Sequence, residues 1–372
     1  MFWPALQWKR AARVLLPRPV VGVLRNLVVI TLSVLAVASW AGSAGEPPDP
    51  TIPRDYFDSF LPLPDRFDVA RNPATEAKIA LGRQLFFDPR LSRNQSLACS
   101  GCHDLQNFGA DGRMVSLGHV GQPGRRNSPT VYNAAGFVAQ FWDGRSPDVE
   151  DQSKQPILNP VEMAMPDAAG VLATLNAIPG YVTAFERTFP RSRPAVTYDN
   201  MALAIGAFER GLVTPGPFDA FLRGADALSG DQKHGFRRFV EVGCAGCHNG
   251  PALGGQTFEA IGHIRPYPDQ SDLGRFEVTG SRGDRMKFRV PGLRNVAKTA
   301  PYYHDGGIAT LDEAVRSMAT HQLGIELAPA DRRAILAFLD TLTGVQPLDY
   351  VAKPELPPDR DTISTPRGGG GL

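Results

Sequence analysis

The chain has 372 residues, and its 39 lysines and arginines nearly balance its 38 aspartates and glutamates. No basic stripe stands out along it, which argues against a nucleic-acid-binding protein. Its length allows two domains of ordinary size, and its 38 glycines and 33 prolines predict long loops between modest helices.

The N-terminal 44 residues have the features of an export signal. They contain five basic side chains and no acidic one, then an apolar run from Leu27 to Ala38 and small residues up to Ala44. This order predicts a signal peptide over residues 1–44, cleaved after Ala44. An uncleaved membrane anchor is the alternative, although the apolar run is shorter than the roughly 20 residues of a membrane span. Without this segment the net charge is −4, and both interpretations place the folded part outside the cytoplasm.

The rest of the chain shows helical patterns and little strand pattern. Capping boxes at Ser229-Gly-Asp-Gln232 and Thr310-Leu-Asp-Glu313 mark two helix starts. A short strand is expected near residues 288–290, and the Pro- and Gly-rich residues 346–372 are expected to form a disordered tail. Apolar periodicity and breaker residues predict helices over 75–87, 167–178, 181–189 and 199–213, from 229 towards 244, from 310 through 318, and from 329 onward.

Two pentapeptides contain every cysteine of the chain: Cys99-Ser-Gly-Cys102-His103 and Cys244-Ala-Gly-Cys247-His248. A C-x-x-C-H run is the attachment signature of c-type haem, in which both thiols bind the macrocycle and the imidazole binds the iron. A structural zinc site would need four converging thiolates, and a thioredoxin-like motif would be single and set in a βαβ unit. A disulfide framework would be denser in cysteine. The sequence therefore predicts two covalently bound haem c groups.

The repeated order of helix, motif, long loop and further helices predicts the architecture. We expect a mainly α protein of two class-I cytochrome c-like domains, over residues 53–215 and 216–345, each with one haem. The Pro215-Gly-Pro217 run marks the boundary between them. Because this chemistry attaches haem outside the bacterial cytoplasm, we expect a periplasmic protein.

The second axial ligand of each iron decides its chemistry. Methionine raises the reduction potential, a second histidine lowers it, and an open face permits reaction. Outside the two motifs, the candidate ligands after residue 44 are His119, His234, His263, His304, His321, Met114, Met163, Met165, Met201, Met286 and Met318.

Several phrases, in order and spacing, resemble bacterial di-haem cytochrome c peroxidases over about residues 53–345. The resemblance implies reduction of hydrogen peroxide to water by electrons from a small cytochrome c or cupredoxin. The C-terminal haem would accept the electrons and the N-terminal haem would meet the peroxide. A homodimer is compatible with this resemblance, and the sequence does not name the donor. The phrases that carry it are LGRQLFFDPRLSRNQSLACSGCH, SLGH, RRNSPTVYNAAGF, AQFWDGR, NPVEM, GCAGCHNGPALGG, VPGLRNVAKTAPYYHDG and LDEAVRSM.

The resemblance also assigns the distal ligands and an electron bridge. His119 in SLGH matches the removable distal ligand of the N-terminal haem, released when the other haem is reduced with calcium bound. Met318 matches the distal ligand of the C-terminal haem, and His321, one turn later, is its rival. Trp142 matches the electron bridge between the haems, and packing alone is the alternative role of a buried aromatic.

The remaining assignments concern peroxide and calcium. Glu162 in NPVEM matches the acid–base group of the peroxide pocket, and Gln152 matches the residue that orients peroxide. A buried carboxyl with a raised pKa suits proton transfer. The side-chain oxygen of Asn127 and the carbonyl oxygens of Thr299 and Pro301 match a calcium site, where neutral oxygens suit a hard cation.

Two other functions remain open from the sequence. MauG-type relatives oxidise residues of a partner protein, but they carry tyrosine where Met318 stands. A di-haem electron carrier without turnover would keep both irons capped and would leave Glu162 and Gln152 without a role.

Overall fold

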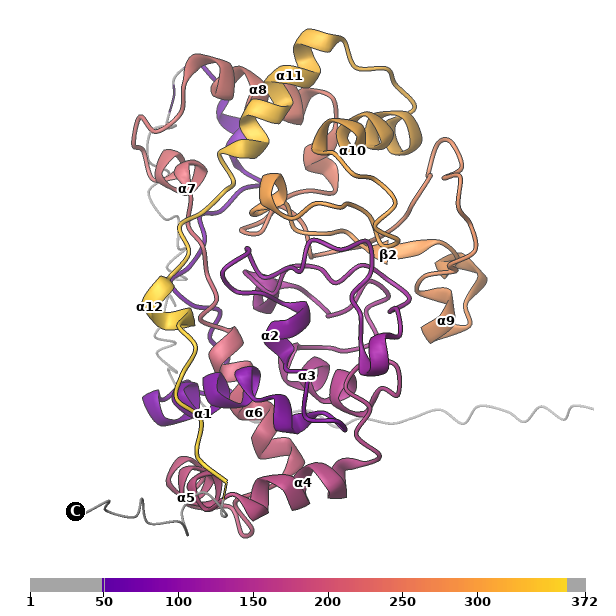
Figure 1. Ribbon diagram of the computed structural model, residues 1–372. Coiled ribbons are helices and arrows are strands. Elements are labelled where there is room, and N and C mark those ends of the chain that lie inside the picture. The colour runs from indigo at the N-terminus through magenta and orange to yellow at the C-terminus, as the bar shows by residue number, and fades with distance from the viewer. Residues whose placement is uncertain (1–48, 50, 360–372) are drawn as a thin grey trace, which may run out of the picture. The chain divides into compact units, whose positions relative to one another are not determined.

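The computed structural model describes residue 49 and residues 51–359 (Figure 1), so the predicted signal peptide lies outside the described residues. The helices are α1 (Glu76–Phe87), α2 (Cys99–Cys102), α3 (Val149–Leu158), α4 (Ala168–Ala177), α5 (Pro179–Thr188), α6 (Tyr198–Glu209), α7 (Pro217–Leu222), α8 (Gly230–Glu241), α9 (Phe276–Thr279), α10 (Leu311–Met318), α11 (Pro329–Asp340) and α12 (Leu348–Val351), and the strands are β1 (Phe258–Ala260) and β2 (Lys287–Arg289).

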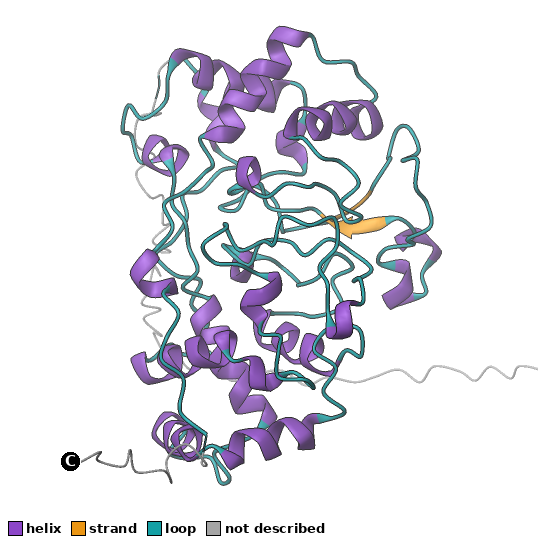
Figure 2. Ribbon diagram, viewed as in Figure 1, coloured by secondary structure: helices purple, strands orange, loops and turns teal. Residues whose placement is uncertain are grey.

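The prediction of a mainly helical fold with little strand is confirmed (Figure 2). The strands β1 and β2 pair antiparallel, with Phe258 opposite Arg289. In Figures 1 and 2, irregular loops occupy the space between the group of helices that includes α1, α4, α5 and α6 and the group formed by α8, α10 and α11. No single helix of the described part has the length and apolarity to cross a membrane; α4 and α5 pass that test only as a pair bent by 104°.

Helix starts follow the local signals of the sequence. The Thr75 side chain accepts a hydrogen bond from the backbone N–H of Lys78 and caps α1. The predicted capping box at Ser229 is formed, and Thr310 caps α10 by accepting from the backbone N–H of Glu313. Helix α3 was not predicted, because Pro156 and its many polar residues hide its periodicity.

A glycine allows close helix crossing in each half of the chain. A methyl group at Gly82 in α1 would lie 1.9 Å from the carbonyl oxygen of Ala204 in α6. A methyl group at Gly235 in α8 would lie 1.9 Å from the carbonyl oxygen of Ala334 in α11. Each glycine lies in the helix before a C-x-x-C-H motif. The internal repeat seen in the sequence therefore extends to the way the helices pack.

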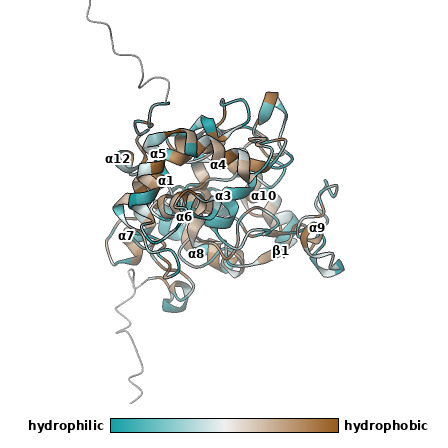
Figure 3. Cartoon of the chain, turned by 90° about the horizontal axis from the view of Figure 1, so that it is seen from below, coloured by the Kyte–Doolittle hydropathy of each residue, from teal (hydrophilic) through white to brown (hydrophobic). Residues whose placement is uncertain are grey.

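Two large apolar clusters and a small one form the core of the described part of the chain. The first joins α1, α4, α5 and α6, which carry both apolar and polar residues, as Figure 3 shows from below. The second is rich in phenylalanine from α7, α8 and α11, such as Phe218, Phe236 and Phe338. The end segments cross the predicted boundary at residue 215: Ile52 packs in the second cluster and Val351 in the first.

The prediction of a disordered tail is wrong for residues 346–359. The Tyr350 ring stacks on Phe208 at a centroid distance of 5.2 Å, and its hydroxyl donates to the Phe208 carbonyl at 2.7 Å. The amide of Gln346 donates to the carbonyl of Leu105. These anchors belong to partners far away in sequence, so local composition could not reveal them. Residues 360–372 lie outside the described part.

Candidate active site

The first motif forms a single helical turn that presents two thiols and an imidazole. Helix α2 spans Cys99–Cys102, and the backbone N–H of His103 donates to the carbonyl of Cys99 at 2.9 Å. The His103 Nδ1 lies 3.4 Å from the carbonyl oxygen of Gly109. A bond from Nδ1 orients the ring and leaves Nε2 for a metal. The thiols are not joined, and burial raises the pKa of Cys99 to about 12.

The second motif repeats this arrangement. A 3₁₀ turn spans Cys244–Gly246, and the backbone N–H of His248 donates to the carbonyl of Cys244 at 3.0 Å. The His248 Nδ1 lies 3.3 Å from the carbonyl oxygen of Leu253, and burial lowers the pKa of the imidazole to about 4. A neutral imidazole with one free nitrogen and two free thiols fit covalent haem at both motifs.

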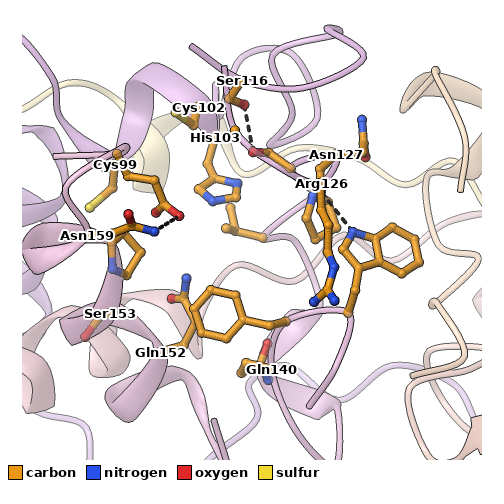
Figure 4. Close-up of a pocket in the computed structure, with 18 of the residues that line it drawn as sticks. Cys99, Cys102, His103, Ser116, Arg126, Asn127, Gln140, Gln152, Ser153 and Asn159 are labelled. Carbon is orange, nitrogen blue, oxygen red and sulfur yellow. Dashed lines mark hydrogen bonds between the residues drawn. The ribbon is translucent and has the colours of Figure 1, made fainter. Parts of the chain in front are cut away.

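A cavity of about 650 Å³ opens beside the first motif (Figure 4). His103 projects into it from one side, and Gln152 of α3 lies on the other. Its size lies within the range of cofactor pockets. The structure thus brings together most of the residues predicted for this site. Those lining the cavity are Cys99, Cys102, His103, Asn127, Trp142, Gln152 and Glu162.

Glu162 is a carboxyl with a raised pKa in this cavity. Desolvation raises the pKa, and the cation of Arg145 and a hydrogen bond from Asn159 oppose the shift. The Asn159 amide donates to the Glu162 carboxylate at 2.7 Å, as Figure 4 shows by a dashed line. A carboxyl so placed can exchange a proton nearer neutral pH than an exposed one.

His119 lies on a short loop that touches the peptide of Glu162. Its backbone N–H donates to the carbonyls of Val161, at 2.9 Å, and Glu162, at 2.7 Å. A methyl group at the preceding Gly118 would lie 2.0 Å from the Val161 carbonyl oxygen. The His119 Nδ1 is buried and has no hydrogen-bond partner in the described part of the molecule. Buried polar atoms rarely lack a hydrogen-bond partner, so this imidazole fits a side chain that binds a group from outside the chain.

Trp142 lies where the two halves of the chain meet. Its indole N–H donates to the carbonyl of Asn127 at 2.9 Å, and its ring packs edge-on to His304 at 6.5 Å. The backbone N–H of Asn127 donates to the His304 carbonyl at 2.8 Å. Trp142 is 8% exposed, so this contact between halves is protected from solvent.

The predicted calcium ligands lie in the segments joined by this contact. Asn127 directs its amide N–H groups towards the carbonyls of Arg113 and Met114. Thr299 and Pro301 lie in the same loop as His304. The described residues contain no group of three or more His, Cys, Asp or Glu suited to a metal ion. Calcium stays a prediction, with neutral oxygens as its ligands.

Met318 and His321 have different surroundings. Met318 ends α10 and packs against Tyr267, Tyr303 and Ala314. His321 lies in the following π-turn, and its Nδ1 is 3.0 Å from the carbonyl oxygen of Arg265. The assignment of Met318 as distal ligand stays a prediction.

Several residues of the cavity were not predicted from the sequence. Asn159 and Arg145 act on the Glu162 carboxyl, and Glu209 is a further carboxyl in the wall. Asn159 lies in the NPVEM phrase, three residues before Glu162, a spacing that favours such a contact. Nothing in the local sequence singles out Arg145 or Glu209.

Comparison with known proteins shows similarity over most of the chain. A family model described as di-haem cytochrome c peroxidase matches residues 76–227. The cytochrome c551 peroxidase of Pseudomonas aeruginosa is 48% identical, over 82% of this chain and 90% of that protein. The corresponding peroxidase of Nitrosomonas europaea is 44% identical, over 80% and 88%. The methylamine utilization protein MauG of Methylorubrum extorquens is 36% identical, over 73% and 79%.

A similar solved structure is that of a MauG-like protein associated with microbial copper homeostasis. It has a TM-score of 0.69 and 29% identity, and the match covers 78% of this chain and 97% of that one. The similarity in sequence and in fold extends well beyond the segment that the family model matches.

Proposed function

The chain belongs to the di-haem cytochrome c peroxidase family and is a peroxidase, and we propose that it reduces hydrogen peroxide to water in the periplasm with electrons from a small cytochrome c or cupredoxin. The observation that carries this proposal is the buried Glu162 carboxyl in the cavity that also holds the first C-x-x-C-H motif.

The family implies haem c, and the chain supplies the groups that would hold it. Cys99 and Cys102 would form the thioether bonds of one haem and His103 would bind its iron; Cys244, Cys247 and His248 would do the same for the other. Bound there, haem supplies one-electron redox chemistry and an iron face for the substrate. The remaining steps depend on side chains of the cavity.

Glu162 moves the proton in this proposal. Its carboxylate accepts a proton from one peroxide oxygen and returns it to the oxygen that departs as water. Asn159 holds the carboxylate in place, and the amide of Gln152, which also lines the cavity, orients the substrate. The cavity limits water around these groups, which strengthens each polar contact.

Other residues control access and electron supply. His119 would be the removable ligand, and its loop is attached to residues 161–162 mainly through backbone contacts. Trp142 would carry the electron between the halves, and Met318 would bind the haem that receives electrons from the donor. Calcium at Asn127, Thr299 and Pro301 would hold the segments at Trp142 together.

A MauG-like oxidation of a partner protein is the second candidate, because MauG proteins are among the relatives. Methionine at position 318, in place of the tyrosine of that group, favours the peroxidase. A donor-dependent peroxide assay, with no protein substrate present, separates the two.

The test of the proposal is Glu162→Gln. We expect peroxide turnover to fall by about 10²–10⁴-fold because the amide cannot exchange the proton. Optical spectra of both haems should stay those of the wild type. The matched control is Glu186→Gln, on the exposed face of α5, which should keep full turnover. Undiminished turnover in Glu162→Gln would remove this residue from the proton-transfer role.

A further inference from the structure

Arg289, at the end of β2, is a buried cation that the proposed mechanism does not use. It is 2% exposed and lines the cavity of the first motif. Its guanidinium lies over the Phe137 ring at 4.2 Å and makes only long bonds to backbone carbonyls, to Phe141 at 3.4 Å and to Val290 at 3.5 Å. No carboxylate lies within 4.0 Å of it among residues 49 and 51–359.

The other deeply buried arginines of the described chain are paired. Arg294 binds Asp219 at 2.7 Å, and Arg210 binds Glu150 at 2.7 Å. Burial without a counter-charge lowers the pKa of Arg289 to about 10, which still leaves it charged at neutral pH. A buried charge is costly unless an opposite charge compensates it, so Arg289 indicates an anionic partner that comes from outside the chain.

The backbone holds this cation firmly in place. Arg289 pairs with Phe258 across the β1–β2 ladder, and its N–H donates to the carbonyl of Trp142 at 2.8 Å. The backbone of Arg289 is therefore fixed to Trp142, the residue that also contacts His304 where the two halves meet. Its planar fork suits a carboxylate, which it can bind through two parallel bonds.

We propose that Arg289 is the anchor for a propionate carboxylate of the haem attached at the first motif. The inference rests on haem being held by Cys99, Cys102 and His103, as the proposed function requires. Propionates are the anionic groups of haem, and the cavity brings Arg289 and the motif into one space. The positive charge of the Arg289 guanidinium would keep the propionate ionised and would stabilise the reduced state of the haem, which carries one positive charge fewer.

The test is a potentiometric titration of the full-length protein over a range of pH, with Arg289→Gln and Arg289→Lys. Mass spectrometry first establishes that both haems are attached, which tests haem binding separately from the role of Arg289. In Arg289→Gln we expect a lower potential for the first haem and a pH-dependent step moved to higher pH by about 1–3 pH units. Arg289→Lys, which keeps the charge, should restore most of the wild-type behaviour.

Arg275→Gln is the matched control. Arg275 lies over the ring of Phe258, the strand partner of Arg289, but is not part of the cavity wall. Its replacement should leave the potential and the pH dependence of the first haem unchanged. Two outcomes overturn the proposal while leaving the proposed function intact: wild-type potentials in Arg289→Gln at every pH, or a change confined to the second haem.

Discussion

The Cys99–His103 and Cys244–His248 segments present the same groups in the same local order, and each imidazole faces a backbone carbonyl, at 3.4 Å and 3.3 Å. Their surroundings differ. Cys99 packs against the apolar cluster of α1, α4, α5 and α6, and Cys244 packs against the phenylalanine-rich cluster of α7, α8 and α11. The first motif also opens onto a cavity with carboxyl and amide side chains in its wall. In the proposed function, the motif therefore serves attachment, and the residues brought around it serve reactivity.

The strongest test of this comparison removes each attachment site in turn. Cys99→Ala with Cys102→Ala, and Cys244→Ala with Cys247→Ala, should each lose one covalent haem by mass spectrometry. The first pair should abolish the optical change caused by peroxide, because its cavity holds the proton-transfer groups. The second pair should lose turnover with the protein donor, and His119→Ala added to it should restore the optical change with peroxide, because the first haem then no longer depends on the second for release of that ligand. A peroxide response in the first pair would contradict the division of roles, and circular dichroism checks folding.

The next test concerns the cap of the second site. Met318→Leu should remove the sulfur-to-iron charge-transfer band in the absorption spectrum and lower the potential of that haem, because thioether ligation raises it. His321→Ala, with Met318 intact, should retain both the band and the potential. If the band survives in Met318→Leu, the assignment of the ligand is wrong.

Glu209, a carboxyl in the wall of the first cavity, should make the free energy of unfolding depend on pH. Burial raises the pKa of Glu209 to about 8, so the folded protein binds its proton more tightly than the unfolded chain does. Its contribution to stability is complete below the unfolded pKa of 4.5 and is lost as pH rises through about 8. This loss amounts to up to about 5 kcal/mol at 1.36 kcal/mol for each pKa unit.

Glu209→Gln should therefore unfold at a higher temperature than the wild type at alkaline pH, with the gap closing towards pH 5. The buried carboxylate of Asp219 in α7 differs, because it is paired with Arg294, and its replacement is not expected to stabilise the protein. Calorimetry at several pH values measures the gap, and Glu186→Gln serves as the control. A gap independent of pH would show that Glu209 does not titrate in this range.

The smallest expected effect concerns the loop that carries His119. Gly118→Ala places a methyl group 2.8 Å from the Glu162 Cα and 2.0 Å from the Val161 carbonyl oxygen. Such overpacking costs about 1–3 kcal/mol. We expect a lower unfolding temperature and a larger high-spin signal of oxidised protein in electron paramagnetic resonance, because the loop is pushed away. Gly124→Ala, whose nearest contact is 3.4 Å, should change neither.

Much of the fold could be predicted because its signals are local. The Thr75 and Ser229 caps act within one turn, and the helices they begin appear where the periodicity places them. The cavity was predictable only in part: Glu162 and Gln152 came from a family resemblance, and they do line it. Arg145, Glu209 and Arg289 are single charges in unremarkable stretches, and their role depends on burial.

The sequence by itself predicted two haem attachment sites, since a thiol pair and its imidazole lie within five consecutive residues. It also determined most helix starts, because a cap needs a partner only three residues away. The tertiary structure alone decided that the first motif opens onto a cavity with carboxyl and amide side chains in its wall, that residues 346–359 pack on the first core, and that Arg289 is buried without a counter-charge. Burial and long-range pairing depend on segments far apart in the chain, which no local pattern encodes.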